Sequence, residues 1–310
     1  METDAQYSSS TSTYINDIEA HWFPEMILRW GFYPLALAAT LSYIIFEVHG
    51  HFGTLGSAYP TYLGVLILLM VGLERLHPLR REWGMTTRKF LIRDLPMLVI
   101  NGAAIGLTSW LINWLSVHAD AEPLITLPTP WWLQAFILLV AFDFMWYWFH
   151  RFSHEGKGTI GKWLWKVHVL HHLPDGVYVF MHPAAHPLNG LVVRTLMMTP
   201  TILFGISPEA IFAAGVINGF QGIVSHFNVD SRAGWFNYLF MGTELHRFHH
   251  SANVDEAKNY AATFSFWDRL FGTYRLPGTA PEHLGVSNRS DYPDDKQWSK
   301  LMTLPFTRQP

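Results

Sequence analysis

Four apolar stretches occupy most of the first half of the chain and limit the folds that are open to it. They cover residues 31–48, 58–73, 95–117 and 129–149. A helix needs about 20 mostly apolar residues to cross the hydrocarbon core of a bilayer. Half of the 310 residues are hydrophobic and only 15% are charged, as is typical of a membrane protein with a substantial polar part. The sequence therefore predicts an all-α integral membrane bundle of about four transmembrane helices. The second stretch is short, and a buried soluble helix is its alternative.

The charges of the connecting loops predict how this bundle is oriented. Residues 74–93 contain six Lys or Arg residues, whereas residues 49–59 and 118–128 contain none. Because Lys and Arg are enriched in cytoplasmic loops, we expect residues 74–93 and both ends of the four-helix unit to face the cytoplasm. The first 20 residues have neither a basic region nor an apolar core, so we expect no cleavable signal peptide there.

Three histidine clusters lie beyond the fourth stretch. They are His150-x-x-x-His154, His168-x-x-His171-His172 and His246-x-x-His249-His250. Spacings of three and four place side chains on one face of a helix. An isolated helical histidine is usually structural, but a pattern repeated in this way is not. Because eight imidazoles exceed what one tetrahedral ion can take, the clusters predict two metal ions. Imidazole binds Fe, Zn, Cu and Ni alike, so the ligands do not select the metal.

The placement of these clusters predicts a helical cap on the cytoplasmic side that carries the dimetal site. Only 13 residues separate His154 from His168, too few to cross the membrane and return. The apolar segment 190–224 is broken by Pro200, Gly205 and Pro208, and two short helices fit it, as a re-entrant hairpin or in the interface. We expect four regions: an N-terminal tail and interfacial segment (1–28), transmembrane helices (29–150), a histidine-box catalytic region (150–275) and a C-terminal tail (276–310).

Asp143 lies inside the fourth stretch, seven residues and about two helical turns before His150. A carboxylate within a membrane span is costly unless it is paired. We therefore expect Asp143 to face the metal centre and to accept a hydrogen bond from a ligand imidazole, a Tyr or an Arg. A carboxylate that reaches out to water is the alternative.

With these residues, the chain resembles the fatty acid hydroxylase superfamily, which includes sterol desaturases, sphingolipid hydroxylases and alkylglycerol monooxygenase. The resemblance covers about residues 141–274. Its motifs are the box formed by Asp143, Tyr147, His150, Arg151 and His154, the segment from Trp165 to His172, the segment from His246 to His250, and the closing segment from Phe266 to Tyr274. It implies a bound dinuclear metal centre, with iron in the working enzyme, and O₂-dependent attack on a lipid C–H bond.

Two further metal ligands are implied by the resemblance alone. His186, in a His-Pro step, and His226, 20 residues before the last cluster, match family positions. They join His150, His154, His168, His171, His172, His246, His249 and His250 in the expected ligand set. The assignment of His182 stays open. Asn259-Tyr260-Ala261 departs from the family's usual Asn-Tyr-Gly.

The expected function is that of a membrane-bound diiron oxygenase that hydroxylates a fatty acyl, sterol or related lipid with O₂ as co-substrate. No flavin, haem or nicotinamide motif is present, so we expect an external electron donor, a ferredoxin or a cytochrome b5-like protein. Zinc can replace iron in purified protein, and no nucleic-acid partner is expected. A lipid desaturase or an ether-lipid monooxygenase would use the same centre. A zinc-dependent membrane hydrolase and a metal-binding membrane protein are the alternatives from other classes.

Overall fold

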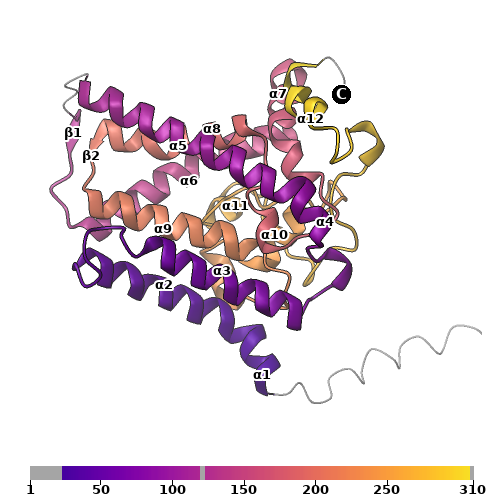
Figure 1. Cartoon of the computed structure of the whole chain (residues 1–310), viewed down its shortest axis with the longest axis horizontal. Helices are drawn as coiled ribbons and strands as arrows, with labels where there is room; N and C mark the ends of the chain where they lie inside the picture. The colour runs from indigo at the N-terminus through magenta and orange to yellow at the C-terminus, as the bar shows by residue number, and fades with distance from the viewer. Residues whose placement is uncertain (1–22, 119–122, 308–310) are drawn as a thin grey trace, which may run out of the picture.

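Long helices lie side by side along the bundle in the computed structural model, which describes residues 23–118 and 123–307 (Figure 1). Within these ranges, four helices are long and apolar enough to cross a membrane: Ile27–Val48, Tyr59–Leu76, Arg81–Ile112 and Trp131–Glu155. They contain α2 (Phe32–Val48), α3 (Tyr59–Leu76), most of α5 (Leu95–His118) and α6 (Trp131–Glu155). The predicted all-α membrane bundle is confirmed, and the short second stretch is one of its four candidate spans.

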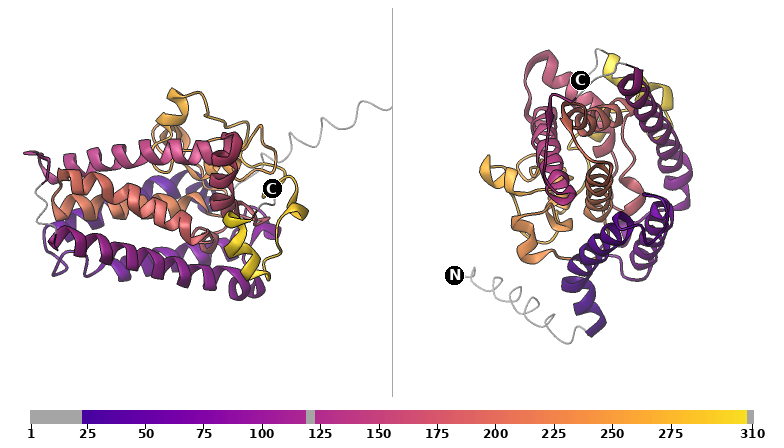
Figure 2. Two further views of the ribbon diagram at one scale, coloured as in Figure 1. Left: turned by 90° about the horizontal axis from the view of Figure 1, so that it is seen from above. Right: turned by 90° about the vertical axis from the view of Figure 1, so that its left-hand side faces the viewer.

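The apolar segment between the histidine clusters forms a helical hairpin inside the bundle. It consists of α8 (Pro187–Leu203) and α9 (Pro208–Ser225), which are 17 and 18 residues long. Seen end on, both helices lie in the middle of the bundle (Figure 2, right). Helix α8 packs against α5 and α6, and α9 packs against α2 and α6. The two helices therefore stand alongside the candidate spans and are longer than the short helices expected.

The tip of this hairpin reaches the far end of the bundle. There β2 (Phe204–Gly205) pairs in parallel with β1 (Ile125–Thr126), in the connection between α5 and α6. The Gln134 side chain fixes the tip, because its amide group donates to Leu127 O and Thr129 O, and its oxygen accepts from Ser207 N–H. At a rise of about 1.5 Å per residue, each helix is roughly 25 Å long, close to the thickness of a hydrocarbon core.

The histidine clusters lie at the opposite end, in a cap of short helices and loops (Figure 1). The cap contains α7 (Gly158–His168), η5 (Val169–His172), η6 (Val179–Met181), α10 (Thr243–His249), α11 (Phe266–Leu270) and α12 (Trp298–Thr303). The remaining short elements are α1 (Phe23–Met26), η2 (Ile27–Gly31), η3 (Arg81–Trp83), α4 (Thr87–Lys89), η4 (Phe90–Asp94), η7 (Gly234–Tyr238), η8 (Arg289–Asp291) and η9 (Leu304–Phe306).

The basic loop between α3 and α5 docks onto this cap. Lys89 Nζ lies 2.9 Å from Asp175 Oδ1, and Arg93 Nη1 lies 3.2 Å from Asp295 Oδ2. The loop and the histidines therefore share one end of the molecule. The segment expected to be a C-terminal tail also belongs to the cap, because Leu301 and Leu304 are buried in a core with Met97 and Leu170.

Candidate metal centre

Nine buried or nearly buried histidines from five parts of the chain lie close together at the cap end of the bundle. His150 and His154 end α6, His168 ends α7, His171 and His172 lie in η5, His226 follows α9, and His246, His249 and His250 lie on or just after α10. They form two groups in which every offered ligand atom lies within 4.8 Å of the others. The five-histidine group contains His150, His154, His168, His172 and His249, and the four-histidine group contains His171, His226, His246 and His250.

The repeated His-x-x-His-His pattern explains why the two groups lie side by side. In η5 and the end of α7, His168 and His172 belong to the five-histidine group, whereas His171 belongs to the other. Of the histidines on or just after α10, His246 and His250 belong to the four-histidine group, and His249 belongs to the five-histidine group. Residues four apart on a helix lie nearly above one another, while the residue between them points to the side. Each of these two clusters therefore supplies ligands to both groups, whereas His150 and His154 both belong to the five-histidine group.

Oxygen acceptors fix the tautomers of five of these imidazoles. The Nδ1 atoms face acceptors as follows: His150 to Tyr260 O at 2.6 Å, His226 to Gly222 O at 2.8 Å, His249 to Lys258 O at 3.0 Å, His168 to Asn189 Oδ1 at 3.1 Å, and His171 to Ala184 O at 3.3 Å. A neutral imidazole carries a single N–H, and an oxygen acceptor holds it on Nδ1. The Nε2 atoms of these rings therefore carry lone pairs that point inward.

The inward-facing nitrogens need cations between them. Nε2 of His168 lies 2.9 Å from Nε2 of both His150 and His172, and Nε2 of His226 lies 3.2 Å from Nε2 of His171. Burial, followed by the effect of neighbouring histidines, lowers the pKa of His168 and His171 well below the usual value, so the rings stay neutral. Two lone pairs at this separation repel each other. The donor set therefore fits two metal ions bound by neutral imidazoles.

His186 is placed apart from both groups, although the resemblance implies that it is a ligand. Its Nδ1 accepts the Leu188 N–H at 3.1 Å, and its Nε2–H donates to Met302 O at 3.0 Å. Both nitrogens are thus engaged in capping α8 and holding the C-terminal segment. The Pro187 that follows occupies the first turn of α8, which directs the His186 side chain to the helix start.

The expectation that Asp143 accepts a hydrogen bond from a ligand imidazole, a Tyr or an Arg is wrong. The fully buried carboxylate accepts hydrogen bonds from three backbone N–H groups, those of Ala262 at 2.8 Å, Thr263 at 3.0 Å and Phe264 at 2.7 Å. Among the described residues, no imidazole, Tyr or Arg side chain bonds to it. Asp143 therefore acts on the centre indirectly, because it anchors the chain just after Tyr260, whose carbonyl oxygen fixes the tautomer of His150.

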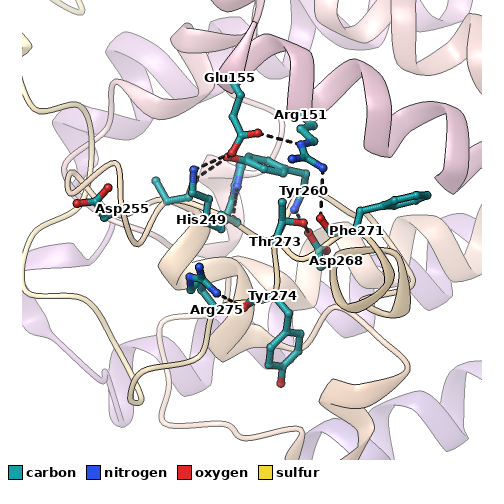
Figure 3. Close-up of polar contacts among 12 residues, drawn as sticks. Arg151, Glu155, His249, Asp255, Tyr260, Asp268, Phe271, Thr273, Tyr274 and Arg275 are labelled. Atoms are coloured by element: carbon teal, nitrogen blue, oxygen red, sulfur yellow. Dashed lines mark hydrogen bonds and ion pairs between the residues drawn. The ribbon is translucent and has the colours of Figure 1, made fainter.

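Two further residues hold this segment and a third holds the chain after His226, and sequence reasoning assigned them no such role. Asp268 accepts the N–H groups of Tyr260 and Ala261, and the Thr273 hydroxyl (Figure 3). Asn259 adopts a left-handed φ of 64° and donates its amide to Leu245 O. Asn259 itself makes the turn, so Ala261 can stand where the family usually has glycine. Fully buried Arg247, inside the third cluster, donates to Phe227 O at 3.0 Å and fixes the chain after His226.

Two cavities approach the centre from different sides. A polar cavity of about 430 Å³ is lined by His154 and His172 of the five-histidine group, together with cap residues such as Glu155 and Lys258. A second cavity of about 130 Å³ is lined by members of both groups and by Phe142 and Trp146 of α6; the histidines are His150 and His168 of the five-histidine group and His171, His226 and His246 of the four-histidine group. We call this second space the inner cavity.

Known proteins are similar to this chain in sequence. The profile of the fatty acid hydroxylase family matches residues 135–273. An ornithine lipid hydroxylase of Rhizobium tropici is 28% identical over 260 residues, which cover 79% of this chain and 75% of that protein. Human alkylglycerol monooxygenase is 29% identical over 55% of this chain and 36% of its own length. Methylsterol monooxygenase 2-2 of Arabidopsis thaliana is 27% identical over 50% of this chain and 60% of its own length. No solved structure matches the chain.

Proposed function

Because the chain belongs to the fatty acid hydroxylase superfamily, we propose that it is a membrane-bound, O₂-dependent diiron oxygenase that hydroxylates a lipid at a C–H bond. One observation carries the proposal. Two adjoining groups of neutral, buried imidazoles, five and four in number, lie beside a cavity inside a membrane bundle. A pair of irons held there would, with O₂ and electrons from outside, supply an oxidant strong enough to attack an unactivated C–H bond.

The residues around the two groups prepare the site for this reaction. The four-histidine group offers fewer nitrogens, and three of its members line the inner cavity. Phe142, Trp146 and Val193 form apolar walls there, along which a lipid chain can approach. The backbone oxygens of Tyr260, Lys258 and Gly222 keep His150, His249 and His226 oriented.

We place the site on the cytoplasmic side and assign electron delivery to a ferredoxin or a cytochrome b5-like protein. The basic loop docks on the cap through Lys89 and Arg93, so the sidedness of the loop is also that of the histidines. The polar cavity next to His154 and His172 supports electron entry from the cap.

A hydrolase would need a free general base near the metal ions, and the two carboxylates nearest to the clusters in sequence are both engaged. Glu155 and Glu244 are the carboxylates nearest to the clusters in sequence. Glu155 lies 2.8 Å from Arg151 and 2.7 Å from Lys258, while Glu244 accepts the N–H of Ala233 and the amide of Asn237 (Figure 3 shows Glu155). Both carboxylates therefore form ion pairs or hydrogen bonds that stabilise the cap. Desaturation would use the same oxidant, but the relatives named above are hydroxylases and monooxygenases, which favours hydroxylation.

Lipid mass spectrometry tests the proposal directly. Cells that express the intact chain should accumulate a lipid that is heavier by one oxygen atom than its precursor, and cells that express His249→Ala should not. The variant removes one nitrogen from the five-histidine group and leaves the spans unchanged. A lipid lighter by two hydrogens would indicate a desaturase, and identical lipid profiles in both strains would contradict the proposal.

A further inference from the structure

The inner cavity contains polar side chains that the protein leaves without partners. Neither ring nitrogen of His182 has a hydrogen-bond partner among the described residues, and its Nδ1 is completely buried. The side-chain amide of Asn218, on α9, likewise bonds to nothing within residues 23–118 and 123–307. Both residues line the cavity. A buried group such as Nδ1 of His182 typically costs about 1–3 kcal/mol when it lacks a partner, so such groups persist where something else supplies the partner. The half-buried amide of Asn218 faces the same space.

The local fold makes room for the His182 ring at this place. A Cβ atom on Gly222 would lie 2.4 Å from His182 Cε1 and 2.7 Å from its Nε2, which no side chain tolerates. The bare backbone of Gly222 therefore lets the ring pack against α9, with its centroid 5.0 Å from that of His226. His182 thus stands next to the four-histidine group and outside both ligand groups.

The size of the inner cavity limits which part of a lipid can reach His182 and Asn218. Its volume of about 130 Å³ is close to that of an apolar protein cavity of about 150 Å³ that holds one benzene molecule. Only the reacting end of a lipid fits there. Because His182 and Asn218 share this space with the histidines of the centre, a group that bonds to them must lie close to the carbon under attack.

We propose that His182 and Asn218 bind a polar group of the lipid, a hydroxyl or an amide, next to the carbon that is hydroxylated. This inference rests on the proposed function and narrows its substrate class. The substrate is a lipid that reacts near a hydrogen-bonding group, and a carbon in the middle of a plain hydrocarbon chain is not attacked. His182 and Asn218 are positioning residues in this account, because the oxidant forms at the metal centre.

The test compares two probes of equal length, 1-dodecanol and dodecane, on the zinc-loaded full chain in lipid nanodiscs. Zinc fills the histidine groups without supporting turnover, so the readout is the midpoint of thermal unfolding and not activity. We expect dodecanol to raise this midpoint and dodecane at the same mole fraction to leave it unchanged. In His182→Leu and in Asn218→Leu, the apparent affinity for dodecanol should fall about five- to tenfold, as expected for one lost hydrogen bond.

The behaviour without a probe separates a binding role from a structural one. Replacing an unpartnered buried group by an apolar one of similar size is neutral or stabilising. Both variants should therefore unfold at the wild-type temperature or above it, and lower unfolding temperatures would overturn the proposal. Thr199→Val is the matched control, because Thr199 lies on α8 with its hydroxyl bonded to Thr195 O at 2.8 Å. It should keep the full response to dodecanol.

The zinc content of the wild-type chain distinguishes a failure of this inference from a failure of the proposed function. If the wild-type chain binds two zinc ions and responds equally to both probes, the inference is wrong and the proposed function stands. If it binds fewer than two zinc ions, the proposed function itself fails. A dodecanol response that survives in both leucine variants would also overturn the inference, because the alcohol would then bind elsewhere or directly to zinc.

Discussion

Nε2 of His150 lies 2.9 Å from Nε2 of His168, while Nδ1 of each ring faces an oxygen acceptor. No proton is available between the two facing nitrogens, because each neutral ring already uses its single N–H on the other side. The same relationship holds between His171 and His226 in the four-histidine group, so each group contains a pair of facing lone pairs that is electrostatically unfavourable without a cation.

Metal removal is therefore expected to destabilise the protein. Treating the purified full chain with a strong chelator should lower its unfolding temperature, and adding iron(II) or zinc should restore it. A ligand present at 100 times its dissociation constant stabilises a protein by about 2.7 kcal/mol for each site. Differential scanning fluorimetry with and without chelator measures the effect. An unfolding temperature that does not respond to chelator would show that the imidazoles are satisfied without metal.

His186 is expected to be structural. In His186→Ala, the metal content should stay at the wild-type value, because both nitrogens of His186 are engaged by Leu188 N–H and Met302 O. Stability should fall by about 1–2 kcal/mol, as for the loss of a helix cap. Elemental analysis and thermal unfolding of the same sample give both results. A drop in metal content with an unchanged unfolding temperature would restore the ligand role that the family resemblance implies.

Asp143→Asn should destabilise the chain that supports His150. Asparagine keeps the shape but replaces one carboxylate oxygen by an NH₂ group, which then faces backbone N–H donors of residues 262–264. The loss of charge-assisted bonds and an unsatisfied buried donor should cost about 2–4 kcal/mol. Asp175→Asn is the control, because that exposed carboxylate pairs with Lys89 at the surface and its replacement should change stability by less than about 1 kcal/mol. Equal unfolding temperatures for the two variants would contradict the anchoring role.

The orientation can be tested with single cysteines, because the natural chain contains none. A cysteine at the exposed Thr54 should react with a membrane-impermeant maleimide in intact cells, and one at the exposed Lys157 should react only after lysis. Thr54 serves better than nearby Gly56, whose φ of 86° would strain any side chain. Gly56 and Ala121 lie in the two loops without Lys or Arg, which we expect to face outward, and Ala121 lies outside the described residues. Labelling at Lys157 in intact cells would place the histidines on the outer side.

Patterns within one element were predictable from the sequence, and partners far apart in the chain were not. The apolar lengths predicted the candidate spans, and the spacing of His246, His249 and His250 predicted that these imidazoles gather at one short helix. The division of these histidines between two groups depends on how α10 faces η5, which no local pattern encodes. Asp143 is separated by about 120 residues from the amides that it binds. His186 was misleading because its His-Pro step matches the family, whereas its contacts arise from the fold of the C-terminal segment.

The most direct test of the dinuclear centre is the metal content of the purified protein. Elemental analysis of the wild-type chain, expressed with ample iron or loaded with zinc, should give two metal ions per chain. His246→Ala, which weakens only the four-histidine group, should reduce this value towards one. A wild-type content of one metal ion or none per fully folded chain would contradict the account.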